Sequence, residues 1–276
     1  MASPVFSSSK EFKADPLLAQ QSTAEDLQRQ YEAPSATPGY ADDRMSYRGV
    51  VNKGVGLGLV TLGLGAGTYF YVAEQPGAML LAFGAGILAL VVGLIAAFKR
   101  TPGVGLVGTY AAAEGVFLGA LTAWIETYFE VPGAGVQALL ATGITFMVCL
   151  WLYRSGKVRY TAKMQKIFMI GAISYLVFSV VNIGIMFLNP DMGAFGARSV
   201  EISIGGLSFP LGAIIGVVAV LLACISLIGD FDFIDNGVKR GLEKKLEWKA
   251  AFGLIVTLVW LYTEFLRLIA LFSGRD

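Results

Sequence analysis

Ionisable side chains interrupt the apolar stretches of this sequence in several places. The run AAFGLIVTLVWLYTEFLRLIALF, at residues 250–272, contains Glu264 and Arg267. Residues three apart lie on the same face of a helix, so these two side chains can form an ion pair along their own helix. Such a pair lowers the cost of burying each charge, but two aliphatic residues in these places would cost less. We therefore interpret Glu264, with Arg267 beside it, as part of a functional site.

Further carboxylates lie in or beside apolar stretches, and Glu126 and Glu130 among them are read as interfacial residues at the outer end of the third block. Glu114, in YAAAEGVFLGA, is ten residues into its block, which is about 15 Å at 1.5 Å per residue and near the middle of a bilayer. Its role, as a protonated group bonded to another helix or as a functional acid, stays open. Asp230, Asp232 and Asp235 end the sixth block, in LIGDFDFIDNG. Asp232 and Asp235 share a helical face and Asp230 points elsewhere. The three carboxylates are either a cation-attracting mouth or a solvated helix end.

The composition excludes several kinds of chemistry. The chain has no histidine, and its two cysteines, Cys149 and Cys224, both lie in apolar stretches. His-based triads and His metal sites are therefore excluded, and the cysteines indicate neither a disulfide framework nor a metal site. No nucleophile, acid pair or metal cluster is arranged for catalysis, so we predict a protein that is not an enzyme and has no cofactor. The formal net charge of +1 predicts no nucleic-acid partner.

Seven apolar blocks position these side chains. Hydrophobic residues make up 55% of the chain and charged residues 15%, whereas about one quarter of a soluble domain is charged. Only helices or closed barrels satisfy the backbone in lipid, and these blocks are too long, and alternate too little, for barrel strands. We predict an all-α membrane protein, a seven-transmembrane-helix bundle. Its helices are expected near residues 50–73, 77–98, 104–128, 133–153, 166–188, 207–231 and 249–272.

The first part of the chain has a different composition. Residues 1–45 are polar, rich in Ser, Ala and Pro, and contain no apolar block. Such a segment cannot bury enough apolar surface to fold, so we predict a disordered cytoplasmic tail, followed by a transmembrane domain over residues 46–276. A short amphipathic helix over residues 17–32 stays an alternative.

Lysine and arginine are distributed unequally between the two sides of the predicted bundle. Fifteen of them lie on one side, whereas the other side has Arg198 in its loops and Arg275 in the C-terminal tail. The positive-inside rule then predicts a cytoplasmic N-terminus and an external C-terminus. The fifteen are Arg44, Arg48, Lys53, Lys99, Arg100, Arg154, Lys157, Arg159, Lys163, Lys166, Lys239, Arg240, Lys244, Lys245 and Lys249.

The order of these features resembles the Bax inhibitor family (transmembrane BAX inhibitor motif), including its bacterial YccA-like branch. The third block carries Glu114 followed by Gly115, where that family's third helix carries a Glu-Gly pair. The last block carries Leu261, Tyr262 and then Glu264, where the family has an aspartate after a Leu-Tyr pair.

The resemblance, over residues 45–272, implies a pH-sensitive passive leak channel for cations, above all calcium. A carboxylate on the sixth helix and one on the seventh would share a proton and gate the pore. In this chain they fall on Asp232, with Asp230 and Asp235 as alternatives, and on Glu264. Two nearby carboxylates cannot both ionise cheaply, and calcium prefers oxygen ligands, so the ion would bind near this pair.

The last two blocks set how near these carboxylates lie to each other. A turn near residue 244 would place Glu264 level with residue 224. Asp232 would then be about 8 residues, or about 12 Å, from that level.

Two other functions fit the same residues. One is a proton-coupled secondary transporter that uses the same carboxylates, and the other is a non-conducting regulator that binds other membrane proteins. In each case the predicted partners are the lipid bilayer and calcium or protons, and the predicted location is a bacterial inner (plasma) membrane, with several spans.

Overall fold

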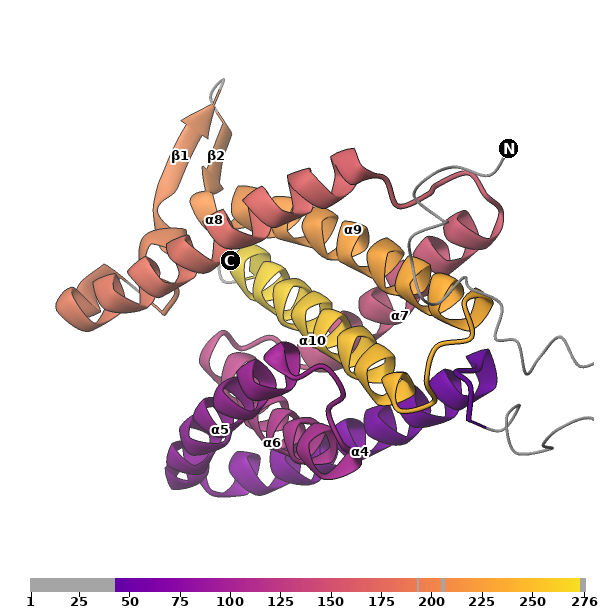
Figure 1. Ribbon diagram of the computed structural model, residues 1–276. Helices are drawn as coiled ribbons and strands as arrows, with labels where there is room; N and C mark the ends of the chain where they lie inside the picture. The colour runs from indigo at the N-terminus through magenta and orange to yellow at the C-terminus, as the bar shows by residue number, and fades with distance from the viewer. Residues whose placement is uncertain (1–42, 193, 205–206, 274–276) are drawn as a thin grey trace, which may run out of the picture. The chain divides into compact units, whose positions relative to one another are not determined.

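The computed structural model describes residues 43–192, 194–204 and 207–273 of the chain (Figure 1). The predicted tail falls almost wholly outside these residues. One compact unit begins at Arg44, and Met45 is already buried in its core.

Seven α-helices lie within the described residues, as predicted. Six of them are long and apolar enough to cross a membrane, while α5 contributes a shorter apolar stretch, Phe83–Phe98. The chain is therefore a helical multi-pass membrane protein. The helices are α4 (Tyr47–Glu74), α5 (Met79–Phe98), α6 (Val104–Tyr128), α7 (Ala134–Arg154), α8 (Ala162–Leu188), α9 (Leu211–Lys239) and α10 (Leu246–Ser273).

The segment between α8 and α9 departs from the predicted helix limits. Two short antiparallel strands, β1 (Glu201–Ile204) and β2 (Leu207–Pro210), precede α9, so the first residues of the predicted 207–231 helix are a strand. Pro210 is the N-cap of α9 in extended backbone, and proline favours the start of a helix because it has no N–H to bond. Short 3-10 turns complete the connections: η2 (Pro76–Ala78), η3 (Pro190–Met192) and η4 (Gly196–Ser199).

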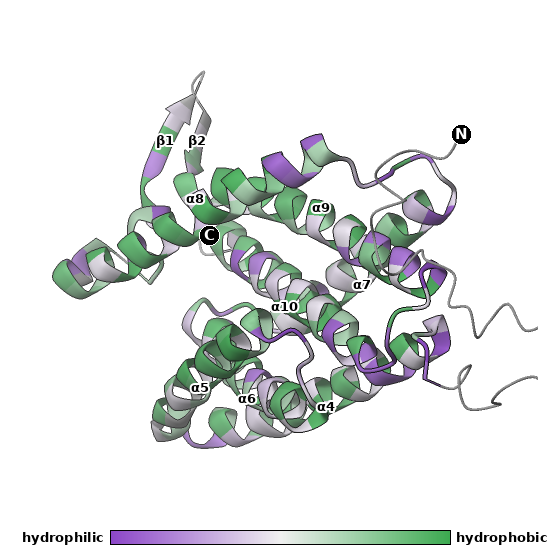
Figure 2. Cartoon of the chain, in the orientation of Figure 1, coloured by the Kyte–Doolittle hydropathy of each residue, from purple (hydrophilic) through white to green (hydrophobic). Residues whose placement is uncertain are grey.

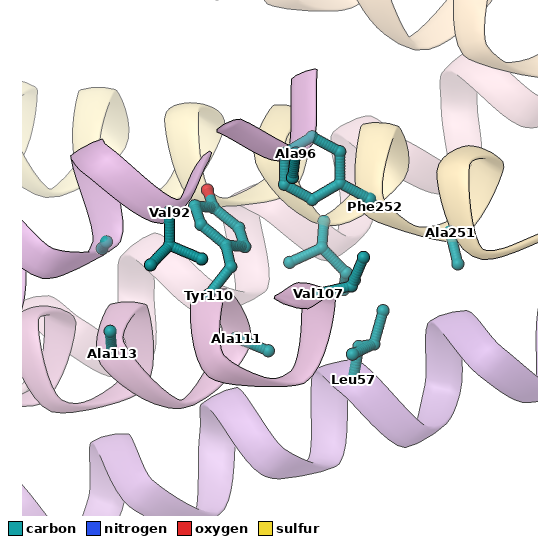
Figure 3. Close-up of a cluster of buried hydrophobic side chains, with 11 residues drawn as sticks. Leu57, Val92, Ala96, Val107, Tyr110, Ala111, Ala113, Ala251 and Phe252 are labelled. Carbon is teal, nitrogen blue, oxygen red and sulfur yellow. The ribbon is translucent and has the colours of Figure 1, made fainter. Parts of the chain in front are cut away.

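Helix α10 is the central helix of the compact unit. It contacts α4, α6, α7 and α9, and Figure 1 shows it running between α9 and the α4–α6 group. Around its first half lies an apolar cluster in which Tyr110 of α6 meets Phe252 edge to face, with ring centroids 5.0 Å apart (Figure 3).

Small residues let α4 and α6 approach closely. A β-carbon added to Gly115 would lie 2.6 Å from the Thr61 carbonyl oxygen, which is closer than real atoms come. The Thr61 hydroxyl donates to the Ala111 carbonyl at 3.1 Å. The glycine of the Glu-Gly pair therefore has a packing role, as small residues do at membrane helix interfaces.

Helices α9 and α10 form an antiparallel pair with a fixed register. Ser226 and Thr257 exchange a hydrogen bond of 3.2 Å, and a β-carbon on Gly216 would lie 2.6 Å from Leu268. The turn between the helices is centred near Gly241, whose φ of 61° lies in the left-handed region that favours glycine. The turn thus comes earlier than the predicted residue 244.

Helices α5 and α8 present apolar side chains on their outer surfaces. Phe98 on α5 is 88% exposed and Phe187 on α8 is 83% exposed, and Figure 2 shows hydrophobic residues along both helices. Side chains of this kind require lipid around them, so both helices contact the bilayer.

Candidate functional site: buried charges along helix α10

Glu264 lies inside the bundle on α10 and is only 1% exposed. Arg267 Nη1 lies 2.6 Å from its Oε1, so the ion pair predicted from the three-residue spacing is present. Tyr175 of α8 donates its hydroxyl to the same carboxylate oxygen, and Arg267 also donates to that hydroxyl at 3.2 Å. The carboxylate therefore links α8 to α10.

A second arginine, Arg198 of η4, completes this group, which we call the Glu264 cluster (Tyr175, Ser179, Arg198, Glu264 and Arg267). Arg198 is 3% exposed, and its Nη1 lies 3.8 Å from Glu264 Oε2. Its Nη2 donates to Ser179 at 3.2 Å, and its guanidinium lies 5.1 Å from the ring centre of Tyr175. Among the described residues, Glu264 Oε2 and Arg198 Nη1 have no hydrogen-bond partner.

Asn182 of α8 holds η4 against the bundle. Its side-chain oxygen accepts from Ala197 N at 2.8 Å, and its amide nitrogen donates to the Phe195 carbonyl at 3.1 Å. The sequence prediction counted Arg198 as a loop residue, and the structure buries it instead. The sequence of α8 indicated a polar face that could receive such a side chain, because Tyr175, Ser179 and Asn182 follow the i, i+4, i+7 spacing of one helical face.

The three aspartates of α9 separate into two environments. Asp230 turns toward α10 and accepts from Thr257 Oγ1 at 2.8 Å. Asp232 and Asp235 face α7, where the Tyr153 hydroxyl lies 3.4 Å from each carboxylate. The spacing therefore placed Asp230 correctly on a different face, and that face is the one toward α10.

Other side chains complete the surroundings of Asp232 and Asp235. Asn236 donates to Asp232 at 2.8 Å, and Asp235 accepts from Tyr47 at 2.6 Å and pairs with Lys239 at 2.6 Å. Tyr160, in the connection before α8, lies against Gly229. Burial, followed by the charges of Asp230 and Asp232, raises the pKa of the Tyr160 phenol above its usual value.

The aspartates and Glu264 lie at different levels of the bundle. The register of α9 and α10 places Glu264 level with Ala219, which is fully buried. Asp232 is thirteen residues further along α9, or about 20 Å at 1.5 Å per residue. Within the described part of the chain, no hydrogen bond joins Asp232 to Glu264.

Glu114 stands apart from both groups of charges. It is half-buried on α6, ten residues after Val104, as the sequence indicated. Its neighbour one turn earlier is Tyr110, whose ring belongs to the apolar cluster around Phe252.

A third buried charge, Glu247, lies at the first turn of α10 and was not identified from the sequence. It is 0% exposed and pairs with Lys53 of α4. Its Oε1 accepts from Ser46 N at 2.9 Å and from Ser46 Oγ at 3.1 Å. The sequence prediction read this region as a connecting loop, GLEKKLEW, and a loop carboxylate gives no sign that a lysine 194 residues away will meet it.

Oxygen ligands are present, but they are dispersed. Within residues 43–192, 194–204 and 207–273, no group of three or more His, Cys, Asp or Glu side chains could hold a metal ion. A calcium position near Asp232 and Glu264 thus stays a prediction.

Comparison with known proteins agrees with the resemblance carried by Glu114 and the last helix. The family model described as Bax inhibitor 1 like matches residues 3–274. The match is wider than the 45–272 range of the resemblance, since it includes the polar N-terminal segment. No match was found among curated proteins. With the family model covering nearly the whole chain, the protein belongs to the Bax inhibitor 1 like family.

Proposed function

We propose that the protein is a pH-sensitive passive leak channel for cations, with calcium as the main ion. The observation that carries this proposal is the inward turn of Asp230. Together with Thr257 and Ser226 it forms a polar strip between α9 and α10, which starts at the aspartate end of α9.

The aspartate end is the proposed cation entrance. Asp232 and Asp235 lie at the end of α9, each within 3.4 Å of Tyr153. Asp230 lies two residues deeper than Asp232 and five deeper than Asp235. Calcium exchanges its water for carboxylate, hydroxyl and carbonyl oxygens, and the strip offers the first two.

The strip is closed toward the Glu264 cluster. Leu227, Leu261 and Ala223 are each 0% exposed and pack together between the two groups of charges. Beyond them, two arginines face one carboxylate. An apolar layer followed by surplus positive charge opposes a cation, so we interpret this arrangement as the closed state of the proposed channel.

Glu264 is the proposed gate. Its single negative charge holds Arg267 and Arg198 and, through Tyr175, helix α8. Adding a proton would remove that charge, and the two arginines would then repel each other and release α8 and η4. Acid opening is the expected direction.

Calcium influx into liposomes loaded with a calcium dye, measured between about pH 5 and pH 8, tests the proposal. Wild-type flux should rise as the pH falls. Glu264→Gln should raise flux at neutral pH and flatten the pH dependence, because the gate has lost its charge. Asp230→Asn should lower flux at every pH, because a cation ligand is lost.

A variant that combines Glu264→Gln with Asp230→Asn distinguishes gating by one shared proton from gating by two independent groups. If Asp230 or Asp232 shared a proton with Glu264, the double variant would add little to either single one. Asp230 is eleven residues along α9 from the level of Glu264, or about 16 Å, so we expect the logarithms of the two effects to add. Asp191→Asn, an exposed aspartate of η3, is the matched control and should leave flux unchanged.

The alternative functions give different results in the same liposomes. A proton-coupled transporter would move protons in step with the ion and would saturate with substrate. A regulator without a conduction path would give no flux at any pH from a well-folded protein, and that result would refute the channel proposal.

A further inference from the structure

A groove runs along the outside of the bundle between α4 and α7. Helices α6 and α10 form its floor, and its volume is about 550 Å³. Cavities of about 300–1,000 Å³ accommodate small organic ligands.

The walls of the groove are apolar and its rim faces lipid. Leu62 and Phe70 of α4 and Val136 of α7 line it, and they are 50%, 66% and 63% exposed, respectively. Both α4 and α7 are long and apolar enough to span a membrane. Because hydrocarbon surrounds such helices, the groove opens sideways into the bilayer and not into water.

Polar side chains gather at one end of the groove. Glu126 of α6 accepts from the Tyr69 hydroxyl at 2.7 Å and from Gly135 N at 2.8 Å. Beside them the hydroxyls of Thr122 and Tyr262 lie 2.6 Å apart. Among the lining residues the one charged side chain is Glu126. A carboxylate can accept about four hydrogen bonds, so it retains capacity for a further donor.

The length of the groove matches one leaflet of a bilayer. Its lining on α4 runs from Gly58 to Phe70, which is about 18 Å at 1.5 Å per residue. The hydrocarbon core of a bilayer is about 30 Å thick, so one leaflet is about 15 Å. The groove therefore extends from the membrane interface, at its Glu126 end, to the bilayer centre.

We propose that this groove binds a single membrane phospholipid whose headgroup carries a protonated amine. One acyl chain lies along the apolar wall, and the ammonium faces the Glu126 carboxylate. The charge of the lining selects the headgroup: an anionic lipid would bring its net negative charge to Glu126, whereas an ethanolamine headgroup brings a hydrogen-bond donor. This site is separate from the Glu264 cluster and does not depend on the proposed ion conduction.

Native mass spectrometry of the full chain tests the site. The protein is equilibrated with an equal mixture of phosphatidylethanolamine and phosphatidylglycerol of matched acyl chains and then stripped of loosely bound lipid. Wild type should retain one phosphatidylethanolamine per chain. Failure to retain any lipid, or retention of both lipids equally, would overturn the proposal.

A substitution that fills the groove tests the acyl-chain position. Gly143 lines the groove, and a β-carbon added there would meet nothing within 4 Å. Gly143→Leu should weaken lipid binding by about tenfold, the loss expected when about two methylene groups are displaced. Gly184→Leu on α8 is the matched control, because a β-carbon there also meets nothing within 4 Å and the position is outside the groove. Equal retention by the two variants would place the lipid elsewhere.

A second substitution tests the headgroup position. Glu126→Gln keeps the shape and the acceptor oxygen but removes the charge, so lipid binding should persist and the preference for phosphatidylethanolamine should disappear. An unchanged preference would show that Glu126 does not select the headgroup. A doubled protein mass in place of bound lipid would assign the groove to a second copy of the chain.

Discussion

Glu264 and Arg198 are buried so completely that water hardly screens them. A charge in such a place costs several kcal/mol unless partners surround it. The Glu264 cluster supplies those partners from three segments, α8, η4 and α10. The cluster therefore forms only when α8, η4 and α10 pack against one another.

Removing one arginine of the cluster should weaken the fold. Arg198→Gln removes the hydrogen bond to Ser179 and the 3.8 Å charge contact with Glu264, which keeps Arg267 as its close partner. Losing a buried hydrogen bond of a charged group costs about 1.5–3 kcal/mol. We expect a loss of this size in the free energy of unfolding, measured by denaturation in detergent.

The matched control is an ion pair at the surface. Lys239 pairs with Asp235 at 2.6 Å, but its side chain is 64% exposed, and exposed pairs contribute about 0–1 kcal/mol. Lys239→Gln should therefore change stability little. Equal effects of the two substitutions would mean that the Arg198 contact is not a buried ion pair in solution.

Helices α4 and α6 are packed backbone against backbone at Gly115 and Thr61. At Gly115 the missing side chain is what allows it, since a β-carbon would lie 2.6 Å from the Thr61 carbonyl oxygen. Backbone atoms cannot move aside as a flexible side chain can, so the two helices would have to separate.

Gly115→Ala should destabilise the protein by about 1–3 kcal/mol, the usual cost of overpacking. Gly108→Ala, on the same helix, meets nothing within 4 Å and should be neutral or stabilise by about 0.5–1 kcal/mol, because alanine favours a helix. Thermal melting of the two variants in the same detergent makes the comparison. Similar melting temperatures would contradict the close approach of α4 and α6.

Helix positions and one ion pair could be predicted from the sequence, because both depend on local spacing. Apolar length set the helices, and the three-residue separation set the Glu264–Arg267 pair. The strands before α9 were missed because a segment of four apolar and polar residues, LSFP, is also a plausible helix start. Arg198 and Glu247 were missed for another reason: their partners come from distant segments, and single-sequence spacing carries no information on such contacts.

For the molecule as a whole, the start of α10 determines how many helices cross the membrane. Met45 N donates to the Leu242 carbonyl at 2.7 Å, and Glu247 meets Ser46, so α4 and α10 begin at the same end. An even number of crossings must therefore separate their starts. Six helices, α4 to α9, lie between, and five crossings would leave the two starts on opposite sides of the membrane. We thus expect α5 to cross as well, although its apolar stretch is short.

Accessibility of introduced cysteines tests this topology. Asp43→Cys and Ser273→Cys, in a background where Cys149 and Cys224 are replaced by alanine, should be labelled from opposite sides of the membrane by an impermeant reagent. Ser155→Cys, which three helices separate from Ser273, provides the reference for the Asp43 side. The positive-inside pattern further predicts that Ser273→Cys is the one labelled in intact cells. Labelling of Asp43→Cys and Ser273→Cys from one side would mean that α5 does not cross.

The pair between Glu247 and Lys53 has a consequence for how the protein is made. The two residues are 194 positions apart, and at a synthesis rate of about 5–20 residues per second the lysine emerges about 10–40 s before the glutamate. During that interval the start of α4 carries a cation whose final counter-charge has not yet been translated. Helix α4 can pack against α6 in that interval, but the start of α4 obtains its counter-charge only when the last helix arrives.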